Sequence, residues 1–327
     1  MQPPSSPAWP ELPYLEWREM YATLHLWTQI VGKVRLALTP WLNHSWHVPL
    51  YVNARGLTTS LIPCAPRGLE IQFDFIAQEL SVTTTDGGAR RMPLVPMSVA
   101  HFHTDTLRML SELDVAVTIN DYPCEIAAAL HFTRDRSLRS YDGHQARQLW
   151  QALVQVERVL QLFRTRFIGK CSPVHFFWGS FDLAVTRFSG RRAPDFAGKV
   201  PGVGPAIMRE AYSHEVSSAG FWPGGPGAEY AAFYSYAYPT PAEFKHARIE
   251  PTAAFFSESL GEYLLPYDAV RAASDPDATL LAFLESTYAA AANTASWDRA
   301  ALECSEGIPG RPRDIALQSH SPSVSTN

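Results

Sequence analysis

Cysteine is scarce in this sequence, and none of it is paired. The four cysteines among the 327 residues are widely spaced and form no C-x-x-C motif. A chain of this length can bury a substantial core without disulfides, and isolated thiols are typical of a reducing compartment. The spacing also lacks the clustered ligands of a zinc cage. The sequence therefore predicts a fold held by its apolar core.

Charge is also sparse, and basic residues do not cluster. Charged residues make up 18% of the chain and the formal net charge is -5, whereas a nucleic-acid footprint is normally basic and concentrated. The stretch 1–13 lacks the basic start and apolar centre of a signal peptide, and no apolar run approaches the ~20 residues that cross a bilayer. We expect a soluble, cytoplasmic protein with neither a nucleic-acid nor a membrane partner. The oligomeric state is left open.

Several catalytic motifs are absent. The sequence has no G-x-G-x-x-G after a predicted strand, no G-x-x-x-x-G-K-[ST], no G-x-S-x-G and no H-E-x-x-H. These absences give no support for a dinucleotide fold, a phosphate-cradling loop, a nucleophile elbow or a zinc protease helix. The cofactor is therefore unknown from the sequence.

Apolar periodicity is strong where it occurs. Residues recur every three or four positions over 15–38, 98–114, 144–168 and 275–293, which predicts amphipathic helices. Period-two patterns and turn residues predict short strands, with Leu69–Phe75 as the clearest example. The strands are expected over 47–52, 57–63, 69–78, 80–85, 90–94, 115–119, 174–191, 213–222, 230–238 and 253–257.

This order of elements predicts an α+β fold of two similarly ordered halves. Each half is expected to be an antiparallel sheet backed by long amphipathic helices, and the halves meet at a shared cleft. We assign 1–14 to an extended arm that lays Trp9 and Leu12 on the body, and 15–143 to the first half. Residues 144–304 form the second half, packed on the first as one globular unit, and 305–327 form a disordered tail.

The most informative stretch is Val174–Arg191, which we interpret as one long strand. With a period of two, Trp178, Ser180 and Asp182 share one face, while His175 and Arg187 share the other. Polar groups between large rings indicate a pocket floor. The alternative is a polar face that meets water, with Asp182 bonded to neighbouring backbone.

These patterns give two sets of candidate site residues. The candidates for proton transfer are Asp182, His175, His214 and Glu215. The candidates for ligand binding come from the first helix, the long strand and a later tyrosine ladder: His25, Gln29, Arg35, Trp178, Ser180, Arg187, Tyr234 and Tyr236. Most of these side chains also fit ordinary roles, since arginines cap helices and tyrosines pack with wet hydroxyls. No metal site is predicted, because the histidine spacings do not require one.

Five motifs carry a resemblance to a known family. They are the stretches Leu24–Lys33, Asn43–Val48, Arg55–Thr59, His175–Asp182 and Phe233–Pro239. With them, the chain up to about residue 293 resembles a bacterial family catalogued only as a domain of unknown function. That family implies no substrate, cofactor or fold.

Two functions of different class follow from the candidate pocket. The first is an enzyme acting on a small anionic or aromatic molecule in an aromatic-lined cleft. The second is a non-catalytic small-molecule binding or interaction protein that uses the same cleft. Titratable groups with strongly shifted pKa values at the pocket floor would favour the enzyme.

Overall fold

The computed structural model describes residues 8–225 and 228–313. The helices of this part are α1 (Tyr14–Leu38), α2 (Val99–Ser111), α3 (Gly143–Thr165), α4 (Pro205–Ala211), α5 (Tyr267–Arg271), α6 (Pro276–Thr294) and α7 (Arg299–Leu302), with 3-10 turns η1 (Asn43–Ser45), η2 (Phe132–Arg134) and η3 (Phe244–His246). Among these described helices, none combines the length and apolar character that a bilayer span requires.

The first half forms a six-stranded antiparallel sheet. Its strands are β1 (Tyr51–Val52), β2 (Gly56–Thr58), β3 (Ile62–Cys64), β4 (Arg67–Asp74), β5 (Glu79–Thr84) and β6 (Ala89–Pro93). They run in the order β1-β2-β4-β5-β6, and β3 pairs with β4. Leu69, Ile71 and Phe73 alternate inward along β4, as their period of two predicts.

The second half forms another six-stranded antiparallel sheet. Its strands are β7 (His175–Phe177), β8 (Asp182–Arg192), β9 (His214–Trp222), β10 (Ala232–Tyr238), β11 (Phe255–Ser257) and β12 (Glu262–Pro266). Their order is β11-β12-β10-β9-β8-β7. The predicted α+β fold of two antiparallel sheet halves is therefore confirmed.

Local sequence signals account for the helix boundaries. The hydroxyl of Ser98 accepts the backbone N–H of His101 at 3.1 Å and caps α2. Asp142 caps α3 and Asp275 caps α6 in the same way. These short polar side chains satisfy N–H groups that have no partner inside the helix.

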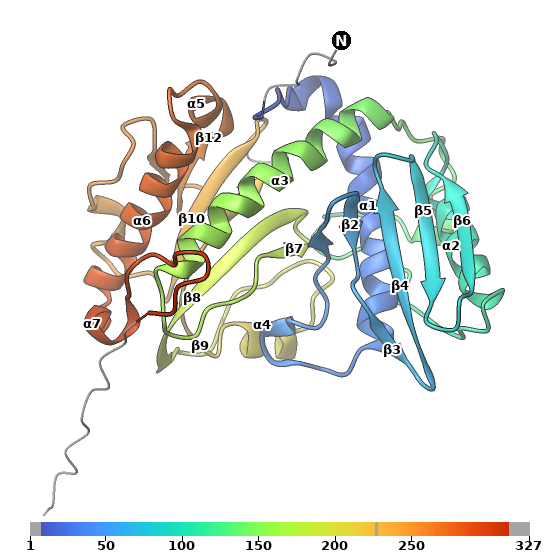
Figure 1. Ribbon diagram of the computed structural model, residues 1–327, viewed down its shortest axis with the longest axis horizontal. Helices are drawn as coiled ribbons and strands as arrows, with labels where there is room; N and C mark the ends of the chain where they lie inside the picture. The colour runs from blue at the N-terminus through green and yellow to red at the C-terminus, as the bar shows by residue number, and fades with distance from the viewer. Residues whose placement is uncertain (1–7, 226–227, 314–327) are drawn as a thin grey trace, which may run out of the picture.

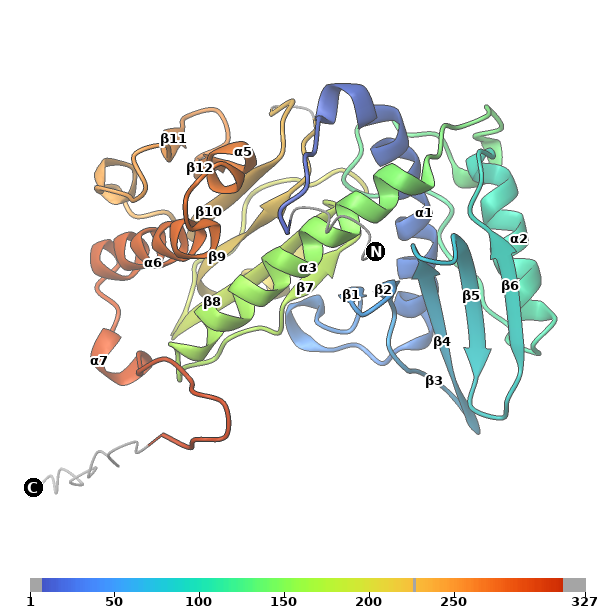
Figure 2. The ribbon, with the colours of Figure 1, turned by 45° about the horizontal axis from the view of Figure 1, so that its top comes forward.

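Two helices join the sheets into one body. Figures 1 and 2 show α3 running diagonally across the molecule from the second sheet toward the first. It packs on β8 and α6, and its other end reaches β1 and β2. Helix α1 lies against α2 and β3 of the first half, and its residues also contact the β7–β8 turn. The strands of the two sheets meet where Leu50 and Phe176 exchange backbone hydrogen bonds of 2.9 Å.

The structure corrects three strand predictions. The predicted strand 57–63 is two short strands, β2 and β3, separated by residues 59–61. Val174–Arg191 is a hairpin of β7 and β8, since Phe181 N–H donates to the Phe177 carbonyl at 2.8 Å and closes a turn. This turn shifts the alternation, so His175 shares a face with its partner Ala184 rather than with Arg187. The predicted strand 115–119 is also wrong, because the segment is irregular backbone.

The two ends of the described chain lie against the body. Trp9 of the N-terminal arm is buried, and its ring centroid lies 5.9 Å from that of Tyr267. Near the other end, Gly307 N–H donates to the Thr165 hydroxyl at 3.1 Å, and Glu306 pairs with Arg166 at 2.6 Å. Part of the segment assigned to the tail thus contacts α3, and 314–327 lie outside the described residues.

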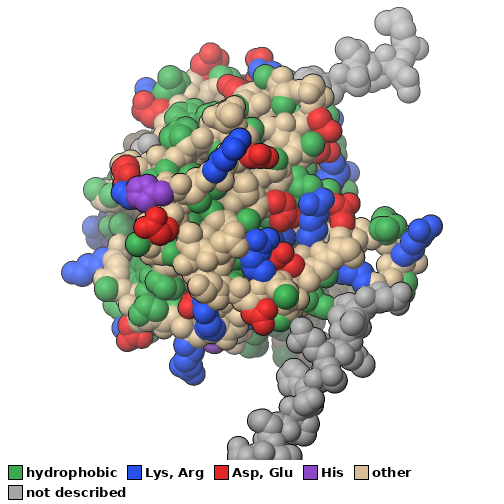
Figure 3. Space-filling model, turned by 90° about the vertical axis from the view of Figure 1, so that its left-hand side faces the viewer, with side chains coloured by type: hydrophobic (Ala, Val, Ile, Leu, Met, Phe, Trp, Pro, Cys, Tyr) green, Lys and Arg blue, Asp and Glu red, His purple; other side chains and the backbone are tan. Residues whose placement is uncertain are grey.

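The surface over the C-terminal helices mixes both signs of charge. Figure 3 shows blue and red side chains interspersed on this side of the molecule. Ion pairs there include Arg158 with Asp277 and Arg299 with Glu303. Because pairs of this kind are exposed, they contribute little to stability.

Candidate functional site

The second sheet has two unlike faces, which we name after Asp182 and Arg187. The strand register defines their members. The Asp182 face carries Asp182, Ala184, Thr186, Ser218, Gly220, Tyr234, Tyr236 and, on β12, Glu262 and Leu264. The Arg187 face carries Leu183, Val185 and Arg187 and is covered by α3 and α6.

Asp182 is buried, and two hydroxyl groups donate hydrogen bonds to it. Its carboxylate accepts the hydroxyls of Ser180 and Tyr234. Tyr234 reaches it across β9 because Gly220 has no side chain; a Cβ there would lie 2.6 Å from the tyrosine hydroxyl oxygen. Burial raises the pKa of Asp182 to about 6, although both hydrogen bonds lower it. The two hydrogen bonds therefore stabilise the ionised form of Asp182, whereas burial destabilises it.

The turn between β7 and β8 is fixed by close contacts. The indole of Trp178 lies on Gly32 of α1, where a Cβ would be 2.2 Å from its nitrogen. That nitrogen donates to the Val48 carbonyl at 2.8 Å. Phe181 adopts a φ of 60° and stacks on His25 with centroids 5.1 Å apart. Trp178 therefore holds the turn, and the absence of a side chain at Gly32 permits this close approach.

Two polar residues of α1, His25 and Gln29, connect the β7–β8 turn to the chain around Cys124. The Nε2 of His25 donates to the Gly179 carbonyl at 2.8 Å, and burial lowers the pKa of His25 to about 4. Gln29 bonds both backbone groups of Cys124, its amide nitrogen at 2.8 Å and its oxygen at 2.9 Å. His25 and Gln29 therefore lie against the β7–β8 turn, where they tie the chain around Cys124 to it.

Glu125 comes directly after Cys124, and the sequence analysis did not predict it as a site residue. A Cβ on Gly179 would lie 2.1 Å from the Oε1 of Glu125, so this carboxyl rests directly on the turn. Burial raises the pKa of Glu125 to about 7, and the charge of Asp182 adds to the effect. The side chain nevertheless keeps accessible surface. It lies in irregular backbone, where no periodicity could have indicated it.

Glu262 was also missed, and it brings a third carboxyl to the Asp182 face. Burial, followed by the charge of Asp182, raises its pKa to about 7. Burial raises the pKa of Tyr212, and the charge of Glu262 adds to the effect. The hydroxyl of Tyr212 lies 3.0 Å from that of Tyr236. The positive φ of 73° at Gly261 marks the hairpin that places Glu262, and this glycine was the available sequence signal.

The two predicted arginines lie away from Asp182. Arg187 is buried on the opposite face, with its guanidinium 3.4 Å from the ring centroid of Phe163, and it pairs with Glu285 at 3.5 Å. Arg35 donates to the Pro49 carbonyl and lies 5.1 Å from the ring centroid of Tyr51. Neither side chain faces the three carboxyls.

The other predicted proton-transfer residues are also dispersed. His175 shares the Asp182 face but is enclosed by Trp46 and Tyr51, and burial lowers its pKa to about 3. His214 lies beside His44, with ring centroids 5.9 Å apart. Glu215 accepts Arg191 at 2.7 Å. Of the four predicted residues, only Asp182 lies with Glu125 and Glu262.

Metal binding has no support in the described part of the chain. No group of three or more histidine, cysteine, aspartate or glutamate side chains there could hold a metal ion.

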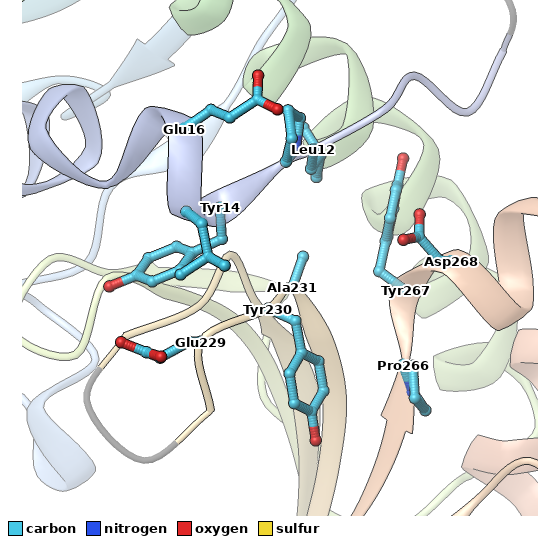
Figure 4. A pocket seen from close by; sticks show the side chains of 11 residues that line it. Leu12, Tyr14, Glu16, Glu229, Tyr230, Ala231, Pro266, Tyr267 and Asp268 are labelled. Carbon is cyan, nitrogen blue, oxygen red and sulfur yellow. The ribbon is translucent and has the colours of Figure 1, made fainter.

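A separate hollow lies at the start of α1. It has a volume of about 440 Å³ and is lined by Tyr14, Glu16, Glu229, Tyr230 and Tyr267 among others. Figure 4 shows Glu229 and Tyr230 on one side of it and Tyr267 with Asp268 on the other. It includes none of the predicted site residues.

Fold and site together define an α+β protein with two linked antiparallel sheets and a carboxyl-bearing, tyrosine-lined face on the second. The chain belongs to the family of unknown function DUF5996, whose model matches residues 9–304. No curated protein and no solved structure matches it.

Proposed function

We propose that the Asp182 face is the active site of an enzyme that transfers protons to or from a small molecule. Glu125 is the proton donor and acceptor, and Asp182 is the fixed negative charge beside it. The observation that carries this proposal is the pairing of the two carboxyls at the β7–β8 turn. Both pKa values are raised, and that of Glu125 to about 7.

The pKa values support different roles for the two groups. Asp182 accepts two hydroxyls, and both hydrogen bonds favour its ionised form even though burial raises its pKa to about 6. Its charge then favours the protonated form of Glu125. A carboxylic acid that titrates near neutral pH is suited to general acid–base catalysis.

Accessibility supports a recess over this face. Glu125 keeps accessible surface, and His25, Tyr234, Tyr236 and Glu262 are half-buried. Burial is nevertheless the largest cause of the pKa shift of each one. Side chains that reach solvent while lying deep among protein atoms line a concave space. The stacked rings of Tyr234 and Tyr236, 6.2 Å apart, would receive a flat or apolar part of the ligand.

The test compares wild type with Glu125→Gln against a library of small ring-bearing metabolites. Binding is followed by thermal shift and conversion by mass spectrometry. We expect Glu125→Gln to bind the same compounds and to lose about 100-fold or more of the conversion rate. Glu258→Gln, which removes an exposed carboxylate paired with Lys245, is the matched control.

Equal conversion by Glu125→Gln and wild type would reject the catalytic role. Compounds that bind at this face without being converted would assign the chain to the alternative class, a small-molecule binding protein.

A further inference from the structure

The charges on the Asp182 face are not balanced by the protein. Asp182, Glu125 and Glu262 lie close enough for Asp182 to raise the pKa of both glutamates. Within the described residues, no lysine or arginine is among the groups that shift any of these three pKa values. The ionised forms of these carboxyls are therefore disfavoured at this face, and a nearby cation would stabilise them.

The nearby cations are engaged elsewhere. Arg187 points to the opposite face and pairs with Glu285. Lys33 lies 5.7 Å from the ring centroid of Trp178. Burial lowers its pKa, whereas Cys124 and Asp121 raise it. Neither side chain pairs with the three carboxyls, so a cationic ligand would supply a positive charge that this face lacks.

The rings on this face suit the same kind of ligand. Tyr234 and Tyr236 stack, and the ring of Tyr212 lies 6.5 Å from that of Tyr236. The faces of tyrosine rings attract cations, and the attraction grows when water is excluded. The hydroxyls add polar contacts for a group that enters between them.

We propose that the ligand of this site is an amine that carries a positive charge, with its ammonium group among Asp182, Glu125 and Glu262 and its apolar part on the tyrosine rings. The inference deepens the proposed function and rests on it, because it concerns the same recess. The sequence also allowed an anionic ligand, but the two predicted ligand-binding arginines, Arg35 and Arg187, lie away from this face.

Binding of such an amine has a defined proton balance. The ammonium group replaces a proton on Glu125 or Glu262, and that proton is released to solvent, so affinity rises from about pH 5 to about pH 8. The other titratable groups facing Asp182 do not interfere in this range. The pKa of His25 is about 4, and the pKa values of Tyr212, Tyr234 and Tyr236 are raised above 10.0.

Matched compounds of different charge test the inference by calorimetry. Benzylamine, benzyl alcohol and benzoate share one ring, and phenethyl and cyclohexylmethyl sets extend the series. We expect each amine to bind about ten-fold tighter than its alcohol, and each carboxylate to bind weakest. Measurements in two buffers of different ionisation enthalpy should show proton release with the amines alone.

Glu262→Gln should reduce the preference for amine over alcohol about five-fold without weakening alcohol binding, because it removes one carboxylate from the recess. Glu258→Gln, an exposed carboxylate three residues after Phe255, is the control. Equal affinity across charges, preference for the carboxylates, or no amine bound at millimolar concentration would overturn the inference. If alcohols or carboxylates were instead converted in a Glu125-dependent reaction, the proposed function would stand and this inference alone would fail.

Discussion

The two faces of the second sheet bury charge in different ways. On one face, Arg187 is enclosed by the rings of Phe163 and Tyr288, bonds the Phe163 carbonyl and pairs with Glu285. On the other face, Asp182 has hydroxyl donors but no cation among the described residues, and two further carboxyls lie near it. The protein supplies an oppositely charged partner for Arg187 but none for Asp182 among the described residues.

This difference separates a structural charge from a functional one. A buried ion that the fold fully pairs fixes the packing around it, and removing one partner leaves an uncompensated group. A set of carboxyls that the fold leaves unpaired costs stability at neutral pH and is retained where a ligand or a proton uses it. Substitutions that remove charge from the two faces should therefore have opposite effects on stability at neutral pH.

The largest effect is expected at Arg187. Arg187→Ala should lower the free energy of unfolding by about 3–5 kcal/mol, because it removes the buried partner of Glu285, leaving only the more distant Arg166, and empties the space among the rings. Urea denaturation measures the change. Arg187→Met, which keeps the apolar stem, should lose clearly less. If Arg187→Met is stable but loses all ligand response, the division into two faces is wrong.

Asp182→Asn should behave in the opposite way. Since the folded pKa of Asp182 is raised to about 6, its contribution to stability is present below the unfolded value of about 3.9 and is lost as pH rises through about 6. The neutral variant avoids this loss. Relative to wild type, its stability should rise by up to about 3 kcal/mol between about pH 4 and pH 8.

Thermal denaturation across this pH range provides the measurement for Asp182→Asn. Asp195→Asn removes an exposed charge and serves as the control. A variant that is less stable than wild type at pH 8 would place Asp182 among the structural charges.

Gly220→Ala tests the path by which Tyr234 reaches Asp182. The added Cβ would lie 2.3 Å from the Leu183 carbonyl oxygen and 2.6 Å from the Tyr234 hydroxyl. We expect a loss of about 1–3 kcal/mol in chemical denaturation and a displaced tyrosine. At Gly204 the nearest atom would be 4.0 Å away, so Gly204→Ala should be neutral. Equal stability of the two variants would show that Tyr234 does not pack closely over Gly220.

The smallest effect is expected from Tyr234→Phe, which removes one of the two hydroxyl donors of Asp182. Because this hydrogen bond lowers the pKa of Asp182, its loss should raise that pKa and change stability by about 1 kcal/mol. NMR titration of the aspartate carboxyls measures the shift. Tyr238→Phe, whose hydroxyl donates to the Pro194 carbonyl at 2.9 Å, should leave it unchanged.

Much of the fold follows from local patterns. The alternation along Leu69–Phe75, the Ser98 cap and the long apolar periodicities predicted β4, α2 and the other long helices. The hairpin within Val174–Arg191 did not follow, because its turn has only one glycine and its left-handed residue is Phe181. A period-two interpretation cannot register a reversal that lacks a turn signal.

The candidate site was predictable only in part. Asp182 and Tyr234 lie on strands, so alternation indicated which side of its strand each occupies, but their contact across β9 depends on the strand register. Glu125 lies in irregular backbone that Gln29 holds through tertiary hydrogen bonds. Its position depends on contacts between distant segments, which periodicity does not report.

The titration of Glu125 tests the account most directly. Carbon NMR of glutamate-labelled protein, with Glu125→Gln for assignment, gives its pKa in wild type and in Asp182→Asn. We predict a pKa of about 7 in wild type, and a lower value in Asp182→Asn that stays above 4.5 because burial persists. A wild-type pKa near 4.5 that Asp182→Asn leaves unchanged would contradict the pairing of the two carboxyls.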